Sequence, residues 1–271
     1  MNIKDFGRLQ SRYADLVNDL DHRPYPLSSS PWIMRQTWAN LLFAHWELPI
    51  ERARELVPDC LELDLYDGRA YVGVVPFEMH QVAPRMVPAV RGLSFFPELN
   101  VRLYVKHGDR PGVYFLSLDA ANPIAVWIAI TLYHLPYYYA EMRSTTINNG
   151  DGQDKTDIAY FSRRVTRLAS RGIHSPACLF EARYGPVGEV FASERGSLEY
   201  FLTERYCLYT TWTNRLYRGE IQHKPWPLQK AHATFATNTM LDVHGIKPVH
   251  TEPHLLFARS IDTIEWAIEP I

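Results

Sequence analysis

From Trp32 to the end of the chain, apolar and polar residues alternate in short runs that are separated by turn signals. A repeat of two residues is that of a β-strand with one buried face. The pair Asp67-Gly68 and the loop 107–112 each separate two apolar runs, which is the sequence signal of a β-hairpin. So many runs, with few helical segments and no internal repeat, predict a mainly β (α+β) fold in which an antiparallel sheet closes into a barrel.

The strands that this alternation predicts cover most of the chain. A polar loop, residues 148–154, separates two of them. The expected strands span residues 32–46, 61–65, 70–77, 99–105, 113–118, 137–147, 158–168, 177–184, 206–212, 215–223, 231–237, 253–260 and 262–268.

A few segments follow a helical period instead. Residues 3–20 carry apolar side chains at helical spacing and predict an amphipathic helix, which either straps the barrel or docks a second subunit. Asn122 and Pro123 supply a helix cap and a first helical residue, so the apolar segment 124–133 predicts a buried helix that closes one end of the barrel. We also expect short helices near 49–57 and 197–204, and we divide the chain into an N-terminal helical extension, residues 1–22, and a single barrel domain, residues 23–271.

Composition narrows the function classes. Lys and Arg number 28 and Asp and Glu number 30, a net charge of -2, so the basic face of a nucleic-acid-binding protein is not expected. No apolar run approaches the roughly 20 residues that span a bilayer, and charged residues interrupt the apolar stretches near the N-terminus, so we expect neither membrane insertion nor a signal peptide. Three dispersed cysteines favour a reducing compartment, which predicts a cytoplasmic protein.

Polar residues on two expected strands are the first candidates for a binding site. Alternation places Glu98, Asn100 and Arg102 on one face of their strand, where they either hold a polar ligand inside the barrel or form a solvated outer face. Arg218 and Glu220 share a face of the strand 215–223, as site residues or as a structural ion pair.

Two tyrosines and a group of histidines are further candidates. Tyr137 and Tyr138 either line a cavity or belong to the core. His244, His250 and His254 match no zinc-binding spacing, and the chain contains no phosphate-binding loop, dinucleotide fingerprint or nucleophile elbow. We therefore expect neither a metal nor a cofactor.

Several motifs resemble those of the bacterial YqjF-like proteins, a family of unknown function. They cover roughly residues 24–268, which leaves the start of the chain outside the resemblance. The motifs are WIMRQTW (32–38), YVGVVPF (71–77), FPELNVR (96–102), SLDAANP (117–123), FLTERY (201–206) and LYRGE (216–220). The family is in turn distantly similar to acetoacetate decarboxylase, and this resemblance implies a β-barrel around a central pocket.

The resemblance also bears on the site. It implies that Glu98 corresponds to a pocket glutamate, so that Glu98, Asn100 and Arg102 face inward. Acetoacetate decarboxylase works through a lysine that forms a Schiff base, whereas here Pro136 is followed by Tyr137 and Tyr138. A phenol forms no imine, so Schiff-base decarboxylation is not expected.

Two functions remain open on the sequence. In the first, the chain binds a small molecule, as a binding protein or as an enzyme acting on a small carboxylate or keto compound. Arg102 would then pair with an anionic group, and Glu98 would act as an acid, a base or a hydrogen-bond acceptor. In the second, the chain is a non-catalytic interaction protein with a vestigial pocket, and it assembles into a homo-oligomer. The candidate ligand-binding residues are Glu98, Asn100, Arg102, Tyr137, Tyr138, Arg218 and Glu220.

Overall fold

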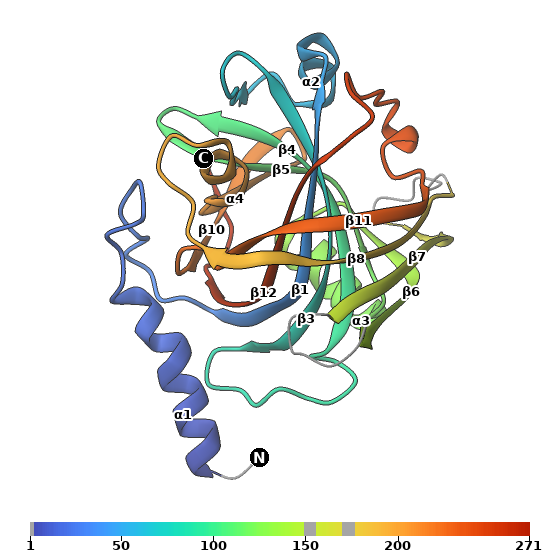
Figure 1. Ribbon diagram of the computed structural model, residues 1–271. Helices are drawn as coiled ribbons and strands as arrows, with labels where there is room; N and C mark the ends of the chain where they lie inside the picture. The colour runs from blue at the N-terminus through green and yellow to red at the C-terminus, as the bar shows by residue number, and fades with distance from the viewer. Residues whose placement is uncertain (1–2, 149–155, 170–176) are drawn as a thin grey trace.

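The computed structural model describes residues 3–148, 156–169 and 177–271, and within them thirteen strands form one sheet (Figure 1). Most of the polar loop expected at 148–154 lies outside the described residues. The strands are β1 (Met34–Leu48), β2 (Glu62–Leu63), β3 (Ala70–Pro84), β4 (Phe96–His107), β5 (Arg110–Ala120), β6 (Tyr137–Asn148), β7 (Thr156–Ala169), β8 (Leu179–Phe191), β9 (Cys207–Trp212), β10 (Arg215–His223), β11 (Leu228–Asn238), β12 (His254–Glu265) and β13 (Glu269–Pro270).

The strand pairings branch at β5 and meet again at β12. Strand β12 pairs with β1, and the series continues through β3 and β4 to β5. One branch returns from β5 to β12 through β9 and β10, and the other returns through β6, β7, β8 and β11. The mainly β character expected from the sequence is confirmed.

Two of the pairings are parallel, which corrects the expectation of a purely antiparallel sheet. Strand β5 runs parallel to β6 and to β9. A parallel pair needs a crossover connection, and the helix α3 (Pro123–Tyr133) supplies it between β5 and β6.

Strands β1, β3 and β4 are buried on both faces. Along β1, Leu42 and Ala44 belong to one apolar cluster, and Leu41 and Phe43 belong to another. Alternate residues of a strand point to opposite sides, so these strands form a wall between two cores. The central parts of these strands therefore turn no face to water, and polar residues there, such as Glu98 and Asn100, point into the protein.

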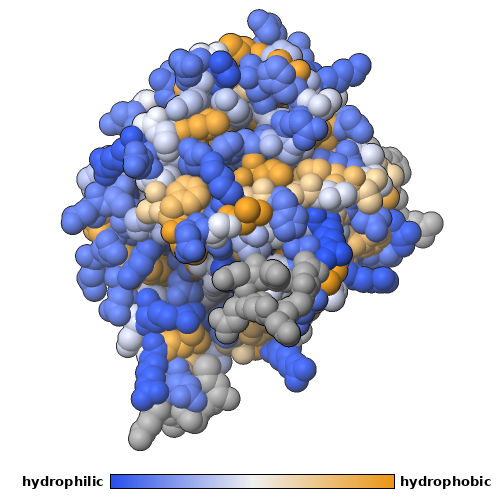
Figure 2. All heavy atoms as spheres, viewed as in Figure 1, coloured by the Kyte–Doolittle hydropathy of each residue, from blue (hydrophilic) through white to orange (hydrophobic). Residues whose placement is uncertain are grey.

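Strands that cover the Leu42 and Ala44 cluster on the side away from the wall have one solvated face. Side chains along β11 alternate between partly buried and exposed. The space-filling view looks onto β8 and β11 and is largely hydrophilic, with apolar side chains in smaller groups between the polar ones (Figure 2).

The helices confirm most of the segments expected from helical spacing. Asn122 caps α3, because its Oδ1 accepts hydrogen bonds from the backbone N–H groups of Ile124 and Ala125 at 3.0 and 3.1 Å. The other α-helices of the described residues are α1 (Ile3–Ala14), α2 (Ile50–Leu56) and α4 (Leu198–Thr203), with short 3₁₀ turns at Asp15–Val17 and Asp242–His244. No described helix has the length and apolarity needed to cross a bilayer.

The N-terminal helix ends earlier than its sequence period predicts and packs on the same chain. Its regular part stops at Ala14, and a 3₁₀ turn follows. Tyr13 and Leu16 are buried in a small cluster with Trp32 and Trp266. The first turns of α1 extend away from the sheet (Figure 1).

Two strand predictions are wrong in detail. Tyr66 and Arg69 bridge the expected turn at Asp67-Gly68, but the short strand before it, β2, pairs with β4 and not with β3. The strands expected at 253–260 and 262–268 are one strand, β12. Its pairing with β1 continues through Ser260, Ile261 and Asp262, where the two expected strands were divided.

Candidate functional site

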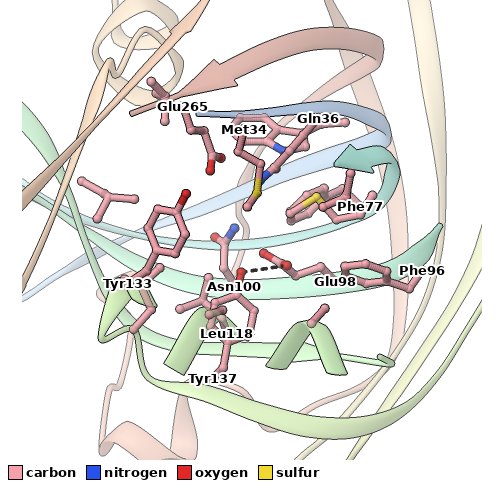
Figure 3. Close-up of a pocket in the computed structure, with 18 of the residues that line it drawn as sticks. Met34, Gln36, Phe77, Phe96, Glu98, Asn100, Leu118, Tyr133, Tyr137 and Glu265 are labelled. Atoms are coloured by element: carbon pink, nitrogen blue, oxygen red, sulfur yellow. Dashed lines mark hydrogen bonds between the residues drawn. The ribbon is translucent and has the colours of Figure 1, made fainter. Parts of the chain in front are cut away.

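A cavity of about 460 Å³ lies on the α3 side of the central wall. Side chains from β1, β3, β4, β5, β6, β9, β10 and β12 line it, together with α3 and the segment between β3 and β4. A volume of this size is within the range that holds a small organic ligand. Most lining residues are apolar, so the few polar side chains that reach the cavity define its chemistry (Figure 3).

Three of the predicted site residues lie in a row on this cavity. Glu98, Asn100 and Arg102 come from β4 and line its wall. The residues between them, Leu99 and Val101, pack into the opposite core with no exposed surface. The alternation predicted the shared face, and the burial of β4 on both sides places that face inside.

The carboxyl group of Glu98 is buried and joined to Tyr137. The Tyr137 hydroxyl donates a hydrogen bond of 3.0 Å to Oε2 of Glu98 (Figure 3). Glu98 is 2% exposed, and burial raises its pKa to about 8, although the Tyr137 hydrogen bond lowers it. The nearby carboxyl groups of Glu265 and Asp119 raise this pKa further. Glu98 is thus a carboxyl group that gains and loses a proton near neutral pH.

A second carboxyl group, that of Glu265, faces the same cavity. Glu265 is the last residue of β12, and its side chain points into the cavity near Tyr133 (Figure 3). Burial raises the pKa of Glu265 to about 7. Within the described part of the chain, neither Glu265 nor Glu98 forms a salt bridge. The cavity therefore contains two carboxyl groups that have no salt-bridge partner among the described residues.

Four further residues that line the cavity carry a buried polar atom with no hydrogen-bond partner in the described structure. These atoms are Oδ1 of Asn100, the hydroxyl group of Tyr133, Nε2 of His223 and Nε1 of Trp226. Burying a polar group without a hydrogen-bond partner destabilises the protein, and a ligand that supplies the partner removes this cost. Figure 3 shows the Asn100 and Tyr133 side chains beside the space between the carboxyl groups of Glu98 and Glu265.

The guanidinium group of Arg102 is held by the protein itself. Its Nη2 donates to the carbonyl oxygen of Leu202 at 2.9 Å, and its Nε donates to the Tyr104 hydroxyl at 3.3 Å. Arg205, the other arginine of the lining, donates to Asp64 and to the carbonyl oxygen of Phe201. Both guanidinium groups thus have partners of their own, which does not favour the anionic ligand expected from Arg102.

Three predicted site residues lie elsewhere. The guanidinium group of Arg164 covers the Tyr138 ring at 4.1 Å, on the other side of the strand from Tyr137. Arg218 pairs with Glu269, which belongs to β13. These residues and Glu220 are not among those that line the cavity.

Glu220 instead forms a buried ion-pair cluster. Its carboxylate contacts Arg23 at 3.1 Å and Arg110 at 2.7 Å, and it accepts a hydrogen bond from the backbone of Ser28. The cluster ties the segment after the N-terminal helix to β10. Of the two interpretations of Arg218 and Glu220, the contacts match the structural ion pair.

Neither a lysine nor a metal cluster is found on the described part of the cavity. The lining residues include no lysine, and Lys106 pairs with Glu62 at 3.3 Å on the surface. The described residues also contain no group of three His, Cys, Asp or Glu side chains that could hold a metal ion.

Sequence reasoning missed Glu265 and the other face of β10. Glu265 lies between the buried residues Ile264 and Trp266, and a lone acid there gave no sign of a ligand site. On β10, Ile221 and His223 line the cavity, whereas the sequence drew attention to the alternate face with Arg218. These residues join the site only through the pairing of β12 with β10.

The fold is similar to that of acetoacetate decarboxylase-like proteins. It is similar to acetoacetate decarboxylase from Legionella pneumophila, with a TM-score of 0.58 and 12% identity over 95% of each chain. A similar match is found to an acetoacetate decarboxylase-like enzyme from Sphingomonas wittichii RW1, with a TM-score of 0.56, 14% identity, and 92% of this chain and 97% of that one covered. The enduracididine biosynthesis enzyme MppR complexed with pyruvate matches with a TM-score of 0.57 and 13% identity, over 91% of this chain and 93% of that one. At these identities the likeness shows the fold alone.

The chain belongs to the DUF2071 family of uncharacterised conserved proteins, whose model matches residues 35–262. It is 44% identical to the uncharacterised protein YqjF of Bacillus subtilis (strain 168) over 237 residues, which cover 88% of this chain and 92% of the relative. The resemblance drawn from the motifs is confirmed.

Proposed function

We propose that this protein binds a small, uncharged carbonyl compound in the cavity and that Glu98 and Glu265 transfer protons to and from it. The observation that carries the proposal is the pair of carboxyl groups that face one apolar cavity, without a salt-bridge partner among the described residues. The strand pairings that return to β12 support a closed barrel as the container of this cavity.

The pKa values suit proton transfer. A general acid or base works best when its pKa lies near the working pH. The pKa of Glu98 is about 8 and that of Glu265 about 7, so near neutrality the pair holds protonated and ionised carboxyl groups together. Two carboxyl groups on one site oppose each other's ionisation, which favours the state with one proton between them.

A carbonyl compound fits the polar groups better than a carboxylate does. An anion would meet two carboxyl groups, while Arg102 and Arg205 are occupied by protein oxygens. A carbonyl oxygen can instead accept a hydrogen bond from the unpartnered Tyr133 hydroxyl or from protonated Glu98. Of the two ligands expected from the sequence, a small carboxylate or a keto compound, we therefore propose the keto compound.

The reaction that follows is keto–enol exchange. The ionised carboxylate of Glu265, the more acidic of the two groups, takes a proton from the carbon next to the carbonyl group, and the electron pair of that C–H bond forms the enol double bond. Protonated Glu98 gives its proton to the carbonyl oxygen, whose π pair becomes the O–H bond. Charge and protons balance with no further reactant, and the reverse transfer restores both carboxyl groups.

Deuterium exchange tests this proposal. The protein is incubated with simple methyl ketones in D₂O, and loss of the α-proton signal is followed by NMR. Wild type is expected to accelerate the exchange, and Glu98→Gln to lose roughly a hundredfold or more of that rate, as removal of a general acid or base does. Glu141→Gln is the matched control, because Glu141 is an exposed glutamate paired with Arg163. Exchange that is absent in wild type, or equal in Glu98→Gln, overturns the proposal.

The free cysteines support the predicted compartment. Cys60, Cys178 and Cys207 form no disulfide in the structure, as in proteins of reducing surroundings. A cytoplasmic location stays a prediction, and fractionation of the native cells would test it.

A further inference from the structure

Five apolar residues both line the cavity and reach the surface. Val87, Val90 and Leu93 lie between β3 and β4 and are 43%, 53% and 41% exposed. Ile124 and Leu132 lie on α3 and are 52% and 61% exposed. Because the same side chains touch the cavity and the solvent, we call this set the apolar mouth.

The two halves of the apolar mouth are held side by side. The side-chain amide of Asn122, which caps α3, donates hydrogen bonds to the carbonyl oxygens of Gly92 and Leu93 at 3.3 and 3.0 Å. On α3 the lining residues Ala125, Ala129 and Leu132 recur at helical spacing, so one stripe of the helix runs along the passage. The small side chains of the two alanines leave room beside the stripe.

We propose that the ligand is amphipathic, with a carbonyl head at Glu98 and Glu265 and a hydrocarbon tail that leaves through the apolar mouth. This inference rests on the proposed function, because it uses the carboxyl pair to place the head. Exposed apolar surface around a cavity marks a binding site for apolar groups. A hydrocarbon tail that extends from the carboxyl pair would contact first the apolar lining of the cavity and then the apolar mouth. One ligand would therefore cover both the apolar lining and the exposed apolar residues.

Affinity should then depend on chain length. Each methylene group that moves from water into an apolar passage contributes about 0.8 kcal/mol, which corresponds to about a fourfold change in Kd. We expect the Kd of methyl ketones, measured by isothermal titration calorimetry, to fall about fourfold per added methylene from butanone upward. The fall should stop at the length that fills the passage.

A pair of variants on one helix locates the tail. Leu132 and Trp127 are both exposed, at 61% and 67%, but only Leu132 lines the cavity. Leu132→Ser is expected to weaken decanone binding severalfold and to leave butanone binding unchanged. Trp127→Ser is the matched control and is expected to change neither.

The outcomes separate this inference from the function on which it rests. If butanone binds but Kd does not change with chain length, or if the two variants have the same effect, the proposed tail site is contradicted. The proposed carbonyl site at Glu98 and Glu265 is then unaffected. If no ketone of any length binds, the proposed function fails and the tail fails with it. A fall in Kd with length that Leu132→Ser removes supports both.

Discussion

The Tyr137 hydroxyl donates a 3.0 Å hydrogen bond to Oε2 of Glu98, and both side chains are buried at the cavity. The two residues come from β6 and β4, which lie on either side of β5. The crossover through α3 makes β6 parallel to β5 and brings the start of β6 to this end of the sheet. Tyr137 therefore stands where the resemblance to acetoacetate decarboxylase led us to look for a lysine, and it supplies a hydrogen bond instead of an amine.

Removal of that hydroxyl group should raise the pKa of Glu98. The hydrogen bond stabilises the ionised carboxylate and lowers this pKa, against the larger effect of burial. In Tyr137→Phe we expect the Glu98 carboxyl to titrate above the value of about 8 that it has in the wild type. Carbon-13 NMR of labelled glutamate side chains measures this titration, and an unchanged or lower pKa would contradict the assigned role of Tyr137.

The free energy of unfolding should fall as pH rises across the titration range of the carboxyl pair. The folded-state pKa values of Glu98 and Glu265, about 8 and 7, lie above the ordinary value of 4.5, so the folded state holds more protons between these limits. Stability is then lost with rising pH, because the unfolded state ionises first. Urea unfolding of Glu98→Gln should show a weaker loss than wild type, and Glu141→Gln should follow wild type. A parallel dependence in Glu98→Gln and wild type would show that Glu98 does not carry the effect.

The Glu220 cluster should matter for stability and not for ligand binding. Glu220→Gln leaves the buried guanidinium group of Arg23 without its carboxylate, and removing one member of a buried ion pair costs about 3–5 kcal/mol. Chemical denaturation measures the loss. Arg218→Gln is the comparison, because the Arg218 pair with Glu269 is partly exposed and should contribute less. Loss of ketone binding in a folded Glu220→Gln protein would return Glu220 to the site.

Borohydride should trap no imine. The described lining of the cavity has no lysine, and the phenol of Tyr137 forms no Schiff base. Protein treated with acetoacetate and borohydride is expected to keep its mass by intact mass spectrometry, as is protein treated with borohydride alone. A covalent adduct would mean that a lysine reaches the substrate after all.

The sequence predicted the local structure well where one physical signal dominates. The Asn122-Pro123 cap located the start of α3, and the turn at Thr213-Asn214 lies between β9 and β10 as expected, with both residues at positive φ. The absence of a lysine after Pro136 also follows from sequence alone. Each of these features depends on a few neighbouring residues, so the chain need not be folded for them to be recognised.

Strand order decided the rest. Alternation placed Glu98 and Asn100 on one face of their strand. A strand that is buried on both sides has the same period as a strand with one solvated face, so the period does not tell the two apart. The apolar cluster on the Glu98 side of β4 shows that this polar face is inside. α3 is apolar all round, so its spacing could not tell which side would line the cavity.

Glu265 and Glu98 meet through tertiary structure alone. They lie far apart in the sequence, and no local pattern links them. The sequence by itself determined where most of the strands, turns and helices form and that tyrosines, not lysines, follow Pro136, because those features are local. Only the tertiary structure decided which side chains share the cavity, because convergence depends on the pairing of β12 with β1 and β10 and on the crossover that brings β6 beside β5.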